Sequence, residues 1–239
     1  MRSSEGEALA EELVAAAGGR ERWREADRLA VEFSSGGLAF ATKRQPRALV
    51  GVTGEVVVSR QQVRLAGSDP NPWSIEVSGS AEMRARLDQV ARRPVWDAWQ
   101  PEDVGVFAAA AMWTYLAIPF VLLDEAYGLE VLRPRAGLRR LAVTMPPGVV
   151  SHSRRQILHV DGHGLVRRHD YTAETFGRWA RASQSLDGHT EFGGLVVATK
   201  RRVTPRLVGR RLPGPGLVWI DVAAVRVSRP SRPGEPRRG

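Results

Sequence analysis

The chain has 239 residues, of which 43% are hydrophobic and 26% charged, and its formal net charge is +9. This length and composition argue against a mostly disordered protein and suit a domain with a sizeable hydrophobic core. The absence of cysteine excludes disulfides, thiolate nucleophiles and cysteine-ligated metal centres.

The basic charge is unevenly distributed along the chain. Residues 1–130 contain 14 basic and 19 acidic side chains, whereas residues 131–239 contain 21 and 7. Only Lys43 and Lys200 are lysines among the 35 basic residues. Because phosphate-binding surfaces usually mix lysine with arginine, the arginine excess favours a biased composition over nucleic-acid binding. Residues 1–7 show no apolar signal core and no lipidation cysteine, which predicts a cytoplasmic protein.

In the first half, helical signals surround a group of short strands. Ser4 is expected to cap a first helix that ends at Gly18 and Gly19, and residues 20–27 are expected to form a second. Residues 81–92 and an apolar segment near 102–123 are also expected to be helical, with Pro119 ending or kinking the latter. Its alanines and flanking acidic residues favour a buried helix over a membrane span. The strands predicted here are 29–33, 38–43, 49–52, 55–65 and 74–78.

The second half is again rich in predicted strands. Asp161-Gly162-His163-Gly164 is typical of a hairpin turn, and residues 173–182 are expected to form a short helix or an irregular crossover. From residue 228 the Pro- and Arg-rich sequence predicts a disordered basic tail, which leaves residues 1–227 as one domain. The predicted strands are 138–145, 156–160, 165–172, 194–203 and 218–227.

Residues 36–51 and 193–209 resemble each other. Both contain Gly-Gly-Leu, Ala-Thr-Lys-Arg, Pro-Arg and Leu-Val-Gly in the same order. They are either a duplicated strand-turn-strand unit or similar hairpins that converged in a biased composition. Since no third copy is present, convergence is slightly favoured.

All five histidines lie between residues 152 and 189, and the predicted 161–164 hairpin places several polar groups beside apolar ones. If Asp161 pairs with Gly164, alternation puts one set of side chains on a single face of the sheet. That face is expected to contain Leu158, Val160, Leu165, Arg167, His169 and Tyr171.

This combination suits acid–base chemistry on a mostly hydrophobic substrate. His169 can move a proton near pH 7, Tyr171 can donate to a developing oxyanion, and Arg167 can hold an acidic group. Asp170 would orient His169. A structural interpretation is equally weighted, with the imidazole capping a backbone carbonyl at a strand end and the tyrosine packing at a rim.

Two further groups were weighed as candidate sites. His189 and Glu191 alternate onto one side of the next segment and could join His169 if the strands are neighbours. His159, Asp161 and His163 are less favoured as a metal site, because a turn rarely holds three ligands tetrahedrally around zinc. Glycine-rich phosphate loops, dinucleotide fingerprints and the Gly-x-Ser-x-Gly elbow do not occur in the sequence, so no metal or cofactor is expected.

The arrangement of elements resembles a known family. The relevant residues are Trp113-x-Tyr115-Leu116-x-x-Pro119-Phe120, then Asp161-x-x-Gly164-Leu165-x-Arg167-x-His169-Asp170-Tyr171, and later Thr199-x-Arg201-Arg202. The pattern resembles uncharacterised bacterial proteins related to the lipoprotein carriers of the Lol system. The resemblance implies an α+β fold, in which a curved antiparallel open half-barrel encloses a hydrophobic cavity lidded by helices. It carries over no functional residue.

The sequence therefore predicts a protein that binds a hydrophobic or amphipathic small molecule, which could carry an anionic group. The leading hypothesis is a cofactor-independent acid–base enzyme of the cyclase, isomerase or lyase type, and the alternative is a non-catalytic lipid or lipoprotein carrier. Nucleic acid is not an expected partner. The expected catalytic residues are His169, Asp170, Tyr171, His189 and Glu191. The expected ligand-binding residues are Arg167, Leu158, Val160, Leu165, Trp113 and Tyr115.

Overall fold

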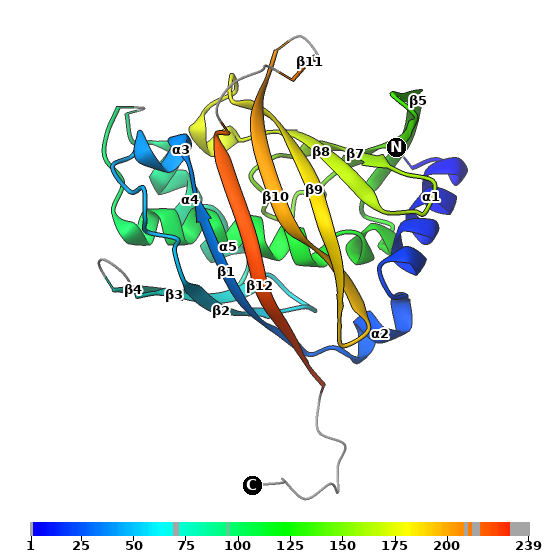
Figure 1. The fold of residues 1–239 in the computed structure, drawn as a ribbon, viewed down its shortest axis with the longest axis horizontal. Coiled ribbons are helices and arrows are strands. Elements are labelled where there is room, and N and C mark those ends of the chain that lie inside the picture. The colour runs from blue at the N-terminus through cyan, green and yellow to red at the C-terminus, as the bar shows by residue number, and fades with distance from the viewer. Residues whose placement is uncertain (1, 69–71, 95, 208–209, 212–215, 230–239) are drawn as a thin grey trace, which may run out of the picture.

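A computed structural model describes residues 2–68, 72–94, 96–207, 210–211 and 216–229. Their largest element is one antiparallel sheet (Figure 1). Its strands are β1 Arg28–Gly36, β2 Val52–Val57, β3 Gln62–Gly67, β4 Trp73–Val77, β5 Gly128–Arg135, β6 Leu138–Thr144, β7 Arg155–Val160, β8 Val166–Thr172, β9 Arg181–Phe192, β10 Leu195–Leu207, β11 Arg210–Arg211 and β12 Val218–Ser228.

The strand order is β4-β3-β2-β1-β12-β10-β9-β8-β7-β6-β5, and β11 pairs with β10 beside this path. Strands β1 and β12, from opposite ends of the chain, join its two halves in the middle of the sheet. Among the described strands, β4 and β5 form the two edges and do not pair with each other. The sheet is therefore an open half-barrel, which confirms the expected α+β fold class.

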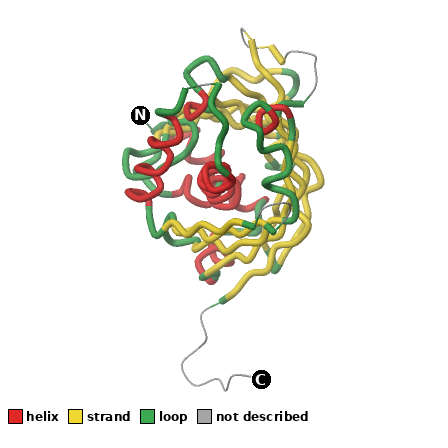
Figure 2. Tube along the Cα trace, turned by 90° about the vertical axis from the view of Figure 1, so that its left-hand side faces the viewer, coloured by secondary structure: helices red, strands yellow, loops and turns green. Residues whose placement is uncertain are grey.

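The helices pack mainly against the concave side and one end of the sheet. Figure 2 shows the long helix α5 near the centre of the molecule, with the strands curving around it. Its partner helix α4 packs beside it. The helices are α1 Ser4–Ala16, α2 Arg20–Glu25, α3 Leu38–Ala41, α4 Ser80–Ala91, α5 Pro101–Ala117 and the short 3-10 helices η1 Phe120–Leu123 and η2 Glu174–Phe176.

The sequence of α5 explains both its ends and its position. Pro101 occupies the first turn, where a missing N–H costs nothing, and the backbone N–H of Gln100 donates to Asp103 Oδ2 at 2.7 Å. The helix ends before Pro119, which cannot supply the next backbone donor. Nearly all of its residues between these ends are buried, as expected for a helix that is apolar on every side. None of the described helices has the length and apolar character needed to cross a bilayer.

Helix α1 covers the far end of the sheet. Leu9 and Leu13 pack with Leu129, Leu141 and other residues of β5, β6 and β7 in a second apolar cluster. The cap is Ser3 rather than the predicted Ser4, and its Oγ accepts from the N–H of Gly6 at 3.1 Å. The helix ends before Gly18, as predicted. The result is an apolar block at this end of the half-barrel.

Several predicted strands in the first half were wrong. Residues 38–43 form α3 and a turn, because Gly37 with φ 128° turns the chain out of the sheet and Phe40 enters the core. Residues 49–51 are also in a turn. The predicted strand 55–65 is a hairpin of two strands, broken where Gln61 leaves the ladder to hydrogen-bond Val150. In the second of the two similar segments, Leu195–Leu207 form β10, so the two segments do not share a fold over their described residues.

The predicted register of the β7–β8 hairpin was wrong. At Val160 it is shifted by one residue, because Asp161 pairs with Leu165 instead of Gly164. A bulge between His159 and Val160 adds a second residue, so Leu158 lies opposite His169 rather than Arg167. The Asp161 carboxylate accepts two backbone N–H groups within the turn, which stabilises the longer loop.

Strands β5 and β9 were not predicted as such. The sequence of β5 contains Pro134 next to an irregular register, and proline is tolerated at a sheet edge or a bulge. Strand β9 begins at Arg181, inside the expected crossover 173–182, where only η2 is helical. The predicted basic tail 228–239 lies outside the described residues apart from Ser228 and Arg229.

Candidate ligand-binding site

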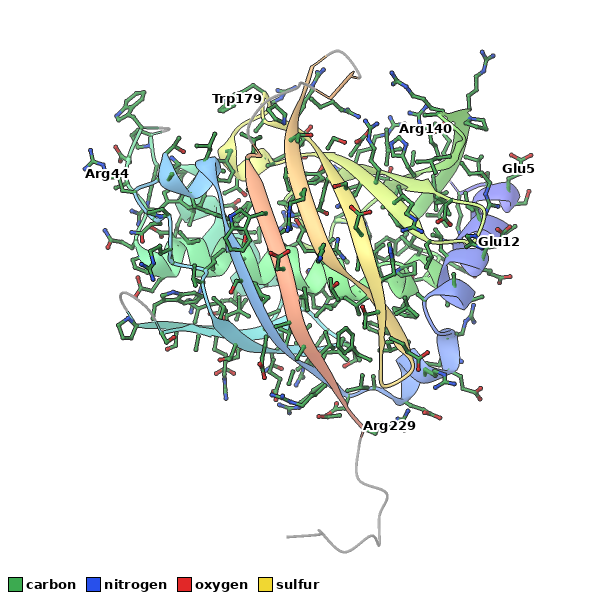
Figure 3. All side chains as sticks on the ribbon, viewed as in Figure 1. Glu5, Glu12, Arg44, Arg140, Trp179 and Arg229 are labelled. Carbon is green, nitrogen blue, oxygen red and sulfur yellow. The ribbon has the colours of Figure 1, made fainter. Side chains whose placement is uncertain are left out.

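A cavity of about 540 Å³ lies between α5 and the concave face of the sheet. Its wall is almost entirely apolar. Phe107, Phe176 and Val203 contribute to it, together with residues of α3, β1 and β12. Trp179 also lines the cavity and is 70% exposed, so it marks the open end. Figure 3 shows Trp179 at the edge of the molecule.

The cavity exists because small side chains face each other across it. Ala108 and Ala111 of helix α5 line the cavity on one side, and Ala182 of β9 lines it on the side of the sheet. Protein interiors are normally close-packed, so small residues on both walls leave space that a larger side chain would fill. The alternation of β10 brings Val203 and Pro205 to the same wall.

Two tyrosines contribute phenol groups to this cavity. Tyr115 and Tyr171 both line it. Gln184 Nε2 donates to the Tyr115 hydroxyl at 3.1 Å. Burial raises the pKa of both phenols, so they are neutral near pH 7 and can donate or accept a hydrogen bond. Both tyrosines were among the predicted site residues, and both lie at the cavity.

A second, smaller cavity lies on the other side of Tyr115. It has a volume of about 60 Å³ and lies among α1, the carboxyl end of α5 and β8 to β10. Its polar side chains include Arg201, His169 and His189, and most of the others are apolar. The predicted residues Leu158 and Leu165 belong to this wall. The single predicted site is thus divided between two cavities that share Tyr115.

Arg201 is the most unusual group in the region. It is 5% exposed, and its Nη1 donates to Gln184 Oε1 at 3.2 Å while Nη2 donates to the Tyr115 carbonyl at 3.3 Å. Its guanidinium lies over the Tyr115 ring, 4.4 Å from the centroid. Burial lowers the pKa of Arg201 to about 10, so the side chain is still a cation at neutral pH.

His169 is buried and neutral in this structure. Its Nε2 lies 2.6 Å from Gln156 Oε1, while Gln156 Nε2 donates to the Ser153 carbonyl at 2.9 Å. These contacts make His169 Nε2 the protonated nitrogen, because the amide oxygen can only accept. Burial, with the nearby His152 and Arg201, lowers the pKa of His169 to about 3. Its proposed role in proton transfer stays a prediction.

His152 lies next to the tyrosines, with its ring centroid 4.5 Å from that of Tyr171. It is 1% exposed, and neither ring nitrogen has a hydrogen-bond partner among the described residues. Burial lowers the pKa of His152 to about 4. The polar cluster around Tyr115 therefore contains neutral imidazoles and phenols, with Arg201 as its cation.

The expected pairing of Asp170 with His169 was wrong. Successive residues of a strand point to opposite faces, so Asp170 faces away from both cavities. It accepts hydrogen bonds from His159 Nε2 at 2.9 Å, Arg168 Nε at 2.7 Å and Arg206 Nη1 at 2.7 Å. Burial alone would raise the pKa of the Asp170 carboxyl, but the hydrogen bonds from His159 and Arg168 hold it well below its usual range. The contacts of Asp170 link β7, β8 and β10.

Arg167 and Glu191 also lie differently from the predicted arrangement. Arg167 Nε donates to Asp161 Oδ2 at 2.7 Å, so its charge is already paired within the hairpin, beside His189. Glu191 is exposed. His189 is half-buried, and its pKa is lowered by burial first and by Arg167 second.

The two remaining ligand-binding candidates pack elsewhere. Val160 belongs to the apolar cluster under α1. Trp113 is buried, and its Nε1 donates to the carbonyl of Arg60 at 3.0 Å, on the side of α5 next to the β2–β3 hairpin. Within the described residues no group of three or more His, Asp or Glu side chains is placed to hold a metal ion.

The predicted site residues did not include Arg201, Gln184 or His152. A signal for Arg201 was present, since adjacent arginines on a strand must point to opposite faces. The structure places Arg201 in the concave interior, whereas Arg202 Nη1 pairs with Asp221 Oδ1 at 2.7 Å outside it. No comparable pattern singles out Gln184 or His152.

Comparisons with known proteins give matches only among solved structures. No protein-family model and no curated protein matches the chain. A LolA superfamily protein from Nitrosomonas europaea is 11% identical, with a TM-score of 0.45 over 92% of this chain and 93% of that chain. A DUF1329 family protein from Desulfovibrio piger is 13% identical, with a TM-score of 0.44 over 94% of each chain. The carrier superfamily named from the sequence is thus represented among the solved structures to which this chain is similar.

Proposed function

We propose that this protein binds a hydrophobic or amphipathic molecule in the large cavity and carries it without changing it chemically. The main support for this proposal is the cavity itself, which has a volume of about 540 Å³ and an almost entirely apolar wall. This volume lies within the range of about 300–1,000 Å³ typical of small-molecule sites. Removing apolar ligand surface from water into such a cavity favours binding.

The lining chemistry supports carriage over acid–base catalysis. The lining residues include no aspartate, glutamate or histidine among the described part of the chain. The titratable side chains there are the phenols of Tyr115 and Tyr171 and the guanidinium groups of Arg181 and Arg206. A general acid or base near pH 7 would need a group whose pKa lies close to that value, and burial moves the pKa of both phenols further above it.

The open end indicates how the ligand would lie. Trp179 and Arg181 are exposed lining residues, so an apolar chain would enter the cavity while a polar or anionic head remained at this rim. An aromatic ring beside a guanidinium suits such an amphipathic boundary.

The test uses a fluorescent fatty-acid probe and native mass spectrometry of the purified protein. Ala111→Trp would fill the cavity from α5, and Ala85→Trp on the exposed face of α4 is the matched control. The parent protein and Ala85→Trp are expected to bind the probe, and Ala111→Trp is expected to lose at least about tenfold in affinity, or about 1.4 kcal/mol.

The same experiment can refute the proposal. If the parent protein does not bind the probe, the proposal is refuted. Equal binding by a folded Ala111→Trp variant would move the site away from this cavity. If Ala111→Trp does not fold, Ala108→Trp on the same helix face tests the same point, with circular dichroism as the check of folding.

A further inference from the structure

The smaller cavity contains a buried cation without a buried anion. Arg201 is 5% exposed, and none of the ion pairs among the described residues includes it. Its hydrogen-bond partners, the Gln184 amide oxygen and the Tyr115 carbonyl, are neutral acceptors. Burying a charge that is not paired costs several kcal/mol.

The contrast with Arg168 and Arg206 is direct. These two arginines share the carboxylate of Asp170 at 2.7 Å each, although both are more exposed than Arg201. The carboxylate thus lies beside the two arginines whose charges water solvates better. Among the described residues of the concave side, where solvation of the guanidinium is poorest, no carboxylate lies within ion-pair distance of Arg201.

Part of the cost is offset by the end of α5. The Tyr115 carbonyl belongs to the last turn of that helix, where the backbone dipoles present partial negative charge. This interaction is weaker than the usual cost of an unpaired buried charge. A helix-capping role alone therefore does not account for the burial of Arg201.

The cavity beside Arg201 has room for a small ligand. Its volume is about 60 Å³, whereas a single water needs roughly 10–15 Å³ measured in this way. Its remaining wall is mostly aliphatic, with Leu116, Leu186 and Val197 among its members. The site therefore offers one cation, neutral imidazoles and an apolar surface.

We propose that this smaller cavity is a second ligand site, which binds a short-chain monocarboxylate through an ion pair between its carboxylate and Arg201. A planar guanidinium matches a carboxylate geometrically, and such charge-assisted hydrogen bonds are stronger than neutral ones. The aliphatic wall would hold the hydrocarbon end. The site is separate from the large cavity and does not depend on the function proposed for it.

Binding of hexanoate, measured by isothermal titration calorimetry, tests the proposal. Hexanol has the same chain without the charge, and hexylamine reverses the charge. The parent protein is expected to bind hexanoate at least about tenfold more tightly than hexanol, and hexylamine more weakly than either. Hexanoate affinity equal to that of hexanol would overturn the proposal, as would no detectable binding of hexanoate.

Matched variants locate the site. Arg201→Gln is expected to lower hexanoate affinity at least about tenfold, whereas Arg202→Gln, the neighbour on the opposite face, is expected to leave it unchanged. Ala198→Phe fills the smaller cavity, whose wall includes Ala198, and is expected to abolish binding even if Arg201→Gln does not fold. Unchanged affinity in either folded variant would refute the assignment.

A competition experiment separates the two sites. Hexanoate is expected to bind the Ala111→Trp variant as it binds the parent protein, because that substitution fills only the large cavity. It is also expected not to displace the fatty-acid probe from the parent. Loss of hexanoate binding in Ala111→Trp would place the carboxylate in the large cavity and overturn the second site.

Discussion

Acidification from about pH 7.5 to about pH 5 is expected to destabilise the protein through two buried histidines. Burial lowers the pKa of His152 from 6.5 to about 4. Burial, together with His152 and Arg201, lowers the pKa of His169 from 6.5 to about 3. In the unfolded chain both side chains titrate near 6.5. The unfolded state therefore binds more protons than the native state as the pH falls below 6.5, and stability decreases.

The expected loss can be worked from these values. At about pH 5 each histidine is still neutral in the folded protein, while its unfolded counterpart lies about 1.5 pH units below its pKa. At roughly 1.4 kcal/mol per unit, each contributes about 2 kcal/mol, or about 4 kcal/mol together. The half-buried His189, whose pKa is also lowered, acts in the same direction. Asp170 does not contribute here, because its stabilising effect is lost only below its ordinary pKa of 3.8.

Urea denaturation at the two pH values measures this loss directly. His152→Phe is expected to remove about half of the pH dependence, and to do so without destabilising the protein at pH 7.5, since neither ring nitrogen has a hydrogen-bond partner among the described residues. His163→Ala, at an exposed position in the hairpin turn, is the control and should leave the dependence intact. A free energy of unfolding that changes by less than about 1 kcal/mol between the two pH values would refute the argument.

Two substitutions test how the sheet and helix are held together. Asp170→Asn removes the shared partner of Arg168 and Arg206 and is expected to cost about 3 kcal/mol in urea denaturation; a loss below about 1 kcal/mol would show that these ion pairs contribute little. Gly105→Ala would place a Cβ 2.5 Å from Trp73 Cζ3, and the indole is held by its hydrogen bond to a backbone carbonyl. The resulting overpacking is expected to cost about 1–3 kcal/mol, more than the gain of about 1 kcal/mol in helix propensity. The variant should therefore have a lower melting temperature, and a higher one would contradict the close contact between Gly105 and Trp73.

Much of the fold was predictable because its signals are local. The helix over 81–92, the apolar helix that stops at Pro119 and the strands 138–145 and 218–227 all follow from periodicity and from proline or glycine boundaries. The resemblance to the carriers also gave the open half-barrel. The predicted strand over residues 38–43 was wrong because the apolar character of this segment is compatible with a strand or with a helix. Only the turn at Gly37 and the core position of Phe40 decided in favour of a helix.

The candidate site was predicted less well, because it depends on contacts between distant parts of the chain. The sequence selected Tyr115, Tyr171 and His169, which do lie at the cavities, but it placed Asp170 with His169 although alternation sends it to the other face.

The sequence by itself determined an alternating, antiparallel sheet with an apolar helix to cover it, since side-chain periodicity is a property of each segment. The tertiary structure alone decided the register, the pairing of β1 with β12 and the division of the site into two cavities. It also decided which of two adjacent arginines is buried. Arg201 and Arg202 are adjacent and chemically identical in the sequence. Because α5 covers the concave face, Arg201 is buried in the interior, whereas Arg202 pairs with Asp221 on the other face.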